Sequence, residues 1–225
     1  MSIGLFGKLP AKRDFMAVRV PRSVLEPYEN WLQSALAISQ NKLGFGWEDT
    51  YLVAPIWRFW IGPSVFGNTC AGAIMPSVDK VGRYFPLTIM YIGASDGSDA
   101  VPMLTGYDDW YASVEEQLLN CLREDIEVDT GTILLNLNEP ISTNGRQNVD
   151  VVRFKEGLSF TGQPSQAIEE FVTSSREAYF NVAAAARSFW WSKGPESGIP
   201  KLHAVDGLPD PHFFSQMLSG VLEAG

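Results

Sequence analysis

Three apolar runs follow one another in the middle of the sequence, and this feature limits the possible folds more than any other. The runs are rich in Ile, Val, Trp, Phe and Tyr, and they span Tyr51 to Ile61, Thr69 to Met75 and Pro86 to Gly93. The linkers between them are short and contain Gly, Pro, Ser and Asp, which favour turns. Successive strands joined by short connections pair with their neighbours, so the sequence predicts an antiparallel meander.

Helical patterns lie on both sides of this meander. Apolar residues recur at helical spacing in three segments, and a fourth helix is expected after Pro209: the ranges are 22–40, 107–125, 165–182 and 209 to about 223. Further strands are expected at 2–8, 132–137 and 184–192. No repeat or linker divides the chain. We therefore predict one α/β domain over residues 1–225, with helices packed on a mixed, partly antiparallel sheet.

The charge of the chain argues against nucleic acid as a partner. The net charge is −9 at pH 7, and an acidic protein repels nucleic acid and anionic lipid unless it carries a local basic patch. The only dense basic group is interrupted by apolar residues and consists of Lys8, Lys12, Arg13, Arg19 and Arg22.

Compartment and redox state follow from two other features of the sequence. No apolar stretch approaches the ~18 residues that a membrane helix needs, and the first twenty residues lack the apolar core of a signal peptide. Cys70 and Cys121 are far apart and each lies among apolar residues, which is typical of buried, reduced thiols. We expect a cytoplasmic protein that does not insert into membranes.

Patterns of known catalytic chemistry are missing from the sequence. The only histidines are His203 and His212, and there is no G-x-S-x-G elbow and no P-loop. The acidic group Asp96, Asp99, Asp108 and Asp109 lacks the alternating spacing of a calcium loop. The sequence therefore predicts neither an enzyme nor a bound cofactor or metal.

Four segments in a fixed order resemble the TagF/ImpM family of proteins associated with type VI secretion. They read GLFGKLPAKRDF from residue 4, PSVDKVGRYFPL from residue 76, SFWWS from residue 188 and GLPDPHFFSQML from residue 207. One position departs from the family pattern, because Arg13 stands where a glycine usually precedes Asp14 and Phe15. The resemblance spans nearly the whole chain. It implies a three-layer α/β fold and a domain for which no catalytic residues are known.

The resemblance also implies a function. Proteins of this family are cytoplasmic accessory proteins that repress the assembly or firing of the type VI secretion machine after translation. They are thought to do so by binding a forkhead-associated scaffold protein. An enzyme with an unrecognised site, or a sensor of a small ligand bound between the first strand and residues 78–87, remains the alternative.

The second of these segments, VDKVGRYFPL, allows two interpretations. In the structural one, Asp79 caps a turn, Gly82 supplies an unusual φ angle, and Arg83 pairs with Asp14 of the first segment. In the functional one, a basic and aromatic patch contacts the partner directly, and its residues are Lys8, Arg13, Arg83 and Tyr84.

The pair Trp190 and Trp191 is a second candidate contact. Neighbours on a strand point to opposite faces, so one indole should enter the core and the other should face a second layer or an interface.

Overall fold

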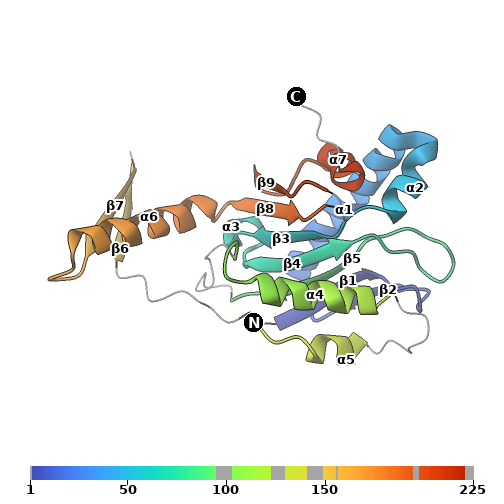
Figure 1. The fold of residues 1–225 in the computed structure, drawn as a ribbon, viewed down its shortest axis with the longest axis horizontal. Coiled ribbons are helices and arrows are strands. Elements are labelled where there is room, and N and C mark those ends of the chain that lie inside the picture. The colour runs from blue at the N-terminus through green and yellow to red at the C-terminus, as the bar shows by residue number, and fades with distance from the viewer. Residues whose placement is uncertain are drawn as a thin grey trace.

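A seven-stranded sheet organises the protein (Figure 1). The computed structural model describes residues 2–94, 103–122, 130–140, 149–155, 157–194 and 198–220. The strand order is β2-β1-β5-β4-β3-β8-β9, and each pair is antiparallel. The bounds are Ser2–Lys8 (β1), Phe15–Val18 (β2), Trp57–Ile61 (β3), Cys70–Met75 (β4), Leu87–Ile92 (β5), Arg187–Ser192 (β8) and Lys201–Asp206 (β9).

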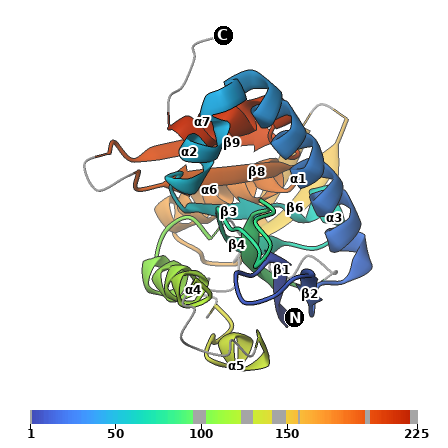
Figure 2. The same ribbon diagram turned by 90° about the vertical axis from the view of Figure 1, so that its right-hand side faces the viewer.

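Helices cover both faces of the sheet. They are α1 (Arg22–Leu43), the 3-10 turn η1 (Gly44–Gly46), α2 (Trp47–Leu52), α3 (Pro63–Phe66), α4 (Asp108–Asn120), α5 (Thr130–Leu135), α6 (Ile168–Ala184), the 3-10 turn η2 (Pro211–Phe213) and α7 (Phe214–Ser219). Side chains of α1, α2 and α7 share one core with one face of the sheet, and side chains of α4 and α5 share a second core with the other face. Figure 2 shows these two helical layers on either side of the strands. The three-layer α/β arrangement is therefore confirmed.

The central strands are buried along their whole length because both faces are covered. In β3, Phe59 and Ile61 enter the core beneath α1, whereas Trp60 enters the core beneath α4. The same alternation runs through β5, where Met90 faces α1 and Ile89 faces α4. This explains why the central strands read as continuous apolar runs in the sequence. The meander β3-β4-β5 is confirmed, and the sheet is more uniformly antiparallel than the sequence predicted.

The segment β6 (Val149–Phe154) pairs with β7 (Gly157–Gly162) to form a separate two-stranded sheet. This hairpin packs on α6, and Figure 1 shows α6 and the hairpin extending away from the main sheet.

Several elements differ from the sequence prediction. Residues 132–137 were expected as a strand, but α5 covers most of them, because a short apolar run has no period that separates a buried strand from a buried helix. Tyr51 begins no strand; it lies in the last turn of α2, and β3 starts only at Trp57. Strands β2, β6, β7 and β9 were not predicted. The last helix ends at Ser219, and its expected continuation lies outside the described residues, as do Asp96 and Asp99.

Candidate functional site

Two loops meet at the end of β1, and they carry the first two segments singled out in the sequence. We call residues 9–14 and 76–86 the motif loops. The Ser77 hydroxyl donates to the carbonyl of Lys8 at 2.7 Å, and the amide of Lys80 donates to the carbonyl of Lys12 at 3.2 Å. These contacts join positions about seventy residues apart, and neither uses an exposed side chain: the donors are the buried Ser77 hydroxyl and a backbone amide, and both acceptors are backbone carbonyls.

Asp79 is the centre of this junction. Its Oδ1 accepts hydrogen bonds from the amides of Val81 (3.0 Å) and Arg83 (2.9 Å). Its Oδ2 accepts from Nε of Arg83 at 2.7 Å and lies 3.1 Å from Nζ of Lys8. Burial alone would raise the pKa of the Asp79 carboxyl, but these donors together hold that pKa well below its usual range. Asp79 is therefore a charged, structural carboxylate.

Arg83 binds Asp79, and the predicted pair between Arg83 and Asp14 is wrong. The guanidinium of Arg83 also donates through Nη2 to the backbone carbonyl of Arg13. The two motif loops are thus tied together as expected, but through a main-chain oxygen, while the Asp14 side chain is exposed. Gly82 has the expected positive φ of 84°, and Arg13 does not belong to the residues with positive φ.

Lys8 does not belong to a surface patch. The residue is 4% exposed, because its ammonium is sandwiched between Asp79 and the ring of Phe15, 4.9 Å from the ring centroid. A lysine at the end of a strand was expected at the surface, and its buried partner, seventy residues away, could not be identified from the sequence.

The exposed part of the motif loops is nevertheless basic. Arg13 and Lys80 are exposed, and the side chain of Arg83 is 55% exposed. Phe15 and Val81 add apolar surface beside them, with exposed fractions of 47% and 55%. We call Arg13, Lys80 and Arg83 the basic face.

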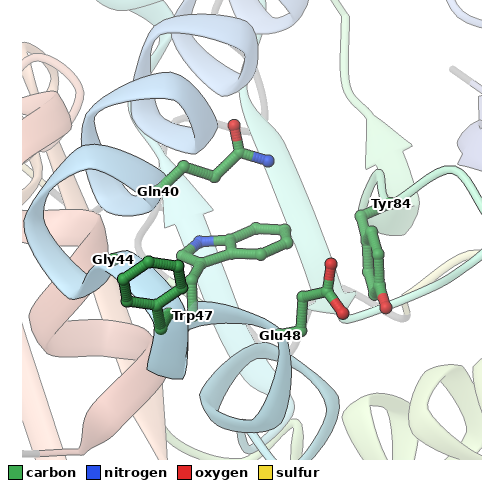
Figure 3. Close-up of a pocket in the computed structure, with 6 residues that line it drawn as sticks. Gln40, Gly44, Trp47, Glu48 and Tyr84 are labelled. Atoms are coloured by element: carbon green, nitrogen blue, oxygen red, sulfur yellow. The ribbon is translucent and has the colours of Figure 1, made fainter.

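Tyr84 belongs to a different feature, a pocket of about 440 Å³. The lining residues come from the end of α1, from η1, from α2 and from the second motif loop: Gln40, Gly44, Phe45, Trp47, Glu48 and Tyr84. Figure 3 shows Gln40, Trp47, Glu48 and Tyr84 around a common space. The pocket thus lies beside the 78–87 segment, as the small-ligand alternative requires, but α1, η1 and α2 form its other wall instead of the first strand.

Aromatic packing fixes the inner wall of this pocket. The Trp47 indole stacks on Tyr51 with ring centroids 4.8 Å apart, and Tyr84 meets both rings edge-on at 5.2 and 5.6 Å. The indole nitrogen of Trp47 donates to the Ser39 hydroxyl at 2.8 Å. Burial, with the charges of Glu48 and Asp49, raises the pKa of Tyr84, so this hydroxyl stays protonated.

Trp190 and Trp191 point to opposite faces of β8, as predicted. Trp190 is fully buried against Trp31 of α1, with ring centroids 5.2 Å apart. Trp191 is half-buried under α4, where it meets Tyr111 at 4.9 Å. Helices therefore contact both indoles.

A buried arginine in β3 was missed by the sequence analysis. The Arg58 side chain is 3% exposed and binds Glu115 of α4 through two hydrogen bonds, of 2.6 and 3.0 Å. Its Nη1 reaches Asp108 at 3.1 Å. Burial alone would lower the pKa of Arg58, but Glu115 and Asp108 raise it, so the guanidinium stays charged. The only indication in the sequence is a single cation within the apolar run WRFWI.

The part of the chain that the structure describes shows no group of three or more His, Cys, Asp or Glu side chains suited to a metal ion. Cys70 and Cys121 are free and buried, as predicted. Within the same residues, no helix combines the length and the apolar character needed to cross a membrane.

Comparison with known proteins supports one family. No curated protein matches the sequence. Among solved structures, the crystal structure of PA0076 from Pseudomonas aeruginosa PAO1 is 30% identical, with a TM-score of 0.83 over 99% of this chain and 96% of that one. The family model of the TagF N-terminal domain, described as type VI secretion system-associated, matches residues 4–136 and so includes both motif loops. The chain therefore belongs to the TagF family of type VI secretion-associated proteins.

Proposed function

We propose that this protein is a non-enzymatic, cytoplasmic repressor of type VI secretion that acts after translation by binding a forkhead-associated scaffold protein. The observation that carries the proposal is the basic face, which presents Arg13, Lys80 and Arg83 on a chain of net charge −9. A local positive surface on an acidic protein steers the approach of a partner with an acidic surface and disfavours other orientations.

The construction of the motif loops suits this role. Asp79, the Ser77 hydroxyl and the backbone bond from Lys80 to Lys12 hold the loops before any partner arrives, so little conformational entropy is lost on binding. Arginine is enriched among the residues that dominate binding energy, and exposed Phe15 and Val81 supply apolar area beside the charges. Together these features favour a protein-binding surface over a site of turnover.

The test reverses charge without touching the buried junction. Arg13→Glu with Lys80→Glu changes two exposed side chains, while the backbone groups that these residues contribute to the loop contacts remain. Lys8 and Arg83 are left unchanged, because both bind Asp79 and their loss would mix unfolding with loss of binding. Arg176→Glu, at an exposed position of α6, is the matched control.

We expect the double variant to keep the wild-type melting temperature. Its capture of the purified forkhead-associated protein should weaken by at least about tenfold, as for two lost charge contacts, and secretion should rise. The control should behave as wild type. If capture and repression both survive the double reversal, the basic face is not the binding surface. If repression is lost while capture stays intact, the protein acts through another site or an activity of its own.

A further inference from the structure

The pocket beside Tyr84 exposes an aromatic side chain that the fold does not use. Phe45 is fully exposed and stands between Gly44 and Gly46, and no atom lies within 4 Å of a Cβ built at either glycine. A phenyl ring left in water forgoes the stabilisation that burial of its apolar surface would give. Its position at the rim of a pocket makes it available to a bound group.

The same pocket holds a carboxylate without a cation. Glu48 lines the pocket and is exposed, and within the described residues it has no ion-pair partner. Asp49 is next to it in α2 and is also exposed. Gln40 adds an amide that can accept or donate a hydrogen bond. Aromatic rings combined with a carboxylate that has no cationic partner are the recognition elements for an organic cation.

We propose that this pocket receives the side chain of a lysine or arginine from the partner polypeptide. The cation would lie against the aromatic side chains of Phe45 and Tyr84 and pair with the carboxylate of Glu48. This inference rests on the proposed function, because it adds a second contact for the same partner. Arg83 and Tyr84 are consecutive, so the basic face and the pocket adjoin, and the partner surface would carry an acidic group next to a basic one.

Other occupants fit the charges less well. An anionic group would face Glu48 and Asp49 at close range, and like charges repel. An apolar side chain would remove water from the Glu48 carboxylate without replacing its hydrogen bonds. A cation satisfies the carboxylate and the aromatic faces together.

The inner wall of the pocket is already packed before anything binds. Trp47, Tyr51 and Tyr84 already pack against one another, and Trp47 is fixed by its hydrogen bond to Ser39. Phe45, in η1 between two glycines, is instead fully exposed. We expect it to close over the bound side chain.

The experiment uses a small probe and the isolated 225-residue chain, so its result does not depend on secretion. Acetyl-arginine amide is titrated into ¹⁵N-labelled protein, and acetyl-citrulline amide, which has nearly the same shape without the charge, is the matched control ligand. The readouts are the Trp47 indole signal and the backbone amides of residues 44–48 and 84. Glu48→Gln removes the charge, and Glu116→Gln makes the same change at an exposed position of α4, on the other face of the sheet.

We expect saturable shifts with the arginine probe at millimolar concentration and none with the citrulline probe. Glu48→Gln should raise the dissociation constant about fivefold, the contribution of an exposed ion pair, and Phe45→Ala about threefold. Glu116→Gln should have no effect. Equal shifts with both probes, no saturable shift, or wild-type affinity in Glu48→Gln would each overturn the proposal. None of these results would contradict the proposed role of the basic face, because that role is tested separately, by partner capture with substitutions at Arg13 and Lys80.

Discussion

The ammonium Nζ of Lys8 lies 3.1 Å from Oδ2 of Asp79, and the two side chains are 6% and 0% exposed. Removing one member of a buried pair leaves the other charge without compensation, which destabilises the folded state. We therefore expect Lys8→Met to lower the melting temperature by roughly 5–10 °C. Lys80→Met, at an exposed position of the loop that carries Asp79, should leave the melting temperature within about 1 °C of wild type, and differential scanning calorimetry would compare the two variants. Equal effects would mean that the buried pair contributes nothing.

Acid should weaken the junction of the motif loops. The pKa of Asp79 is held well below its usual range in the folded state, whereas in the unfolded chain it is about 3.9. Between those two pKa values the unfolded state binds more protons than the folded state. The stability that the Asp79 carboxylate contributes is therefore complete above its unfolded pKa, and it is lost as the pH falls toward its folded pKa. Urea unfolding of wild type and Asp79→Asn at pH 7 and pH 3 tests this. The difference in unfolding free energy between wild type and Asp79→Asn should be smaller at pH 3 than at pH 7. An equal difference at both pH values would contradict this prediction.

The Arg58 cluster should respond unequally to loss of its two acids. Glu115 is 22% exposed and binds the buried guanidinium twice, whereas Asp108 is 83% exposed and binds it once. We expect Glu115→Ala to reduce the free energy of unfolding by about 3 kcal/mol, as for a broken buried pair. Asp108→Ala should cost less than about 1 kcal/mol, as for an exposed pair. Chemical denaturation measures both, and similar losses would show that burial does not separate them.

His203 should make stability depend on pH near neutrality. Burial and, to a lesser degree, Lys201 lower its pKa, and its Nε2 is buried without a hydrogen-bond partner. Its ring packs near Trp57 and Phe213. The folded state favours the neutral imidazole of His203, whereas the unfolded chain binds a proton there with a pKa of about 6.5. The free energy of unfolding should therefore fall as the pH drops below about 6.5.

Thermal unfolding between pH 7.5 and pH 5 measures this effect. The wild-type melting temperature should fall over that range, and His203→Phe should flatten the decline. His212→Gln changes the other histidine, which is exposed, and should leave the decline as in wild type. If His203→Phe follows the wild-type curve, another group is responsible.

The two thiols should react only when the protein opens. Burial raises the pKa of Cys70 and of Cys121 to about 12, so almost no thiolate is present at pH 8. We expect Ellman's reagent to label neither rapidly in the native protein and to label both in urea. Ser64→Cys, at an exposed position of α3, supplies a fast-reacting reference. Rapid reaction of Cys70 or Cys121 without denaturant would contradict their burial.

The sequence predicted the elements whose pattern is local. The central strands are continuous apolar runs because helices cover both faces, and α1 keeps its helical spacing over many turns. Strand β9 was missed because its residues alternate between half-buried and exposed in a segment close to Pro200 and Gly207. The hairpin β6–β7 was missed for a related reason: most of β6 is exposed and β7 alternates between exposed and half-buried residues, so no apolar run marks them.

The candidate site was predicted only in part, because its contacts span long distances in the sequence. The motif loops do meet, and Asp79 and Gly82 have the turn roles expected of them. The partner of Arg83 was assigned to Asp14, although a carboxylate four residues away already binds its side chain and its amide. A possible small-ligand pocket was placed beside residues 78–87, but between them and the first strand, whereas its other wall comes from α1, η1 and α2. This pocket depends on an exposed Phe45 and on a contact between Tyr84 and Trp47 of α2, which are nearly forty residues apart in the sequence.

The order of strands in the sheet also determines which strand edges stay unpaired while the chain is synthesised. β3 lies between β4 and β8 in the sheet. β4 follows β3 closely in the sequence, but β8, which pairs with the other edge of β3, is synthesised far later. Until then the nascent strand WRFWI has an open apolar edge, and such edges recruit foreign strands. The family match ends at residue 136, before β8. A fragment cut there would keep this edge open, so we expect the segment after residue 136, which contains β8, to protect β3 from such pairing.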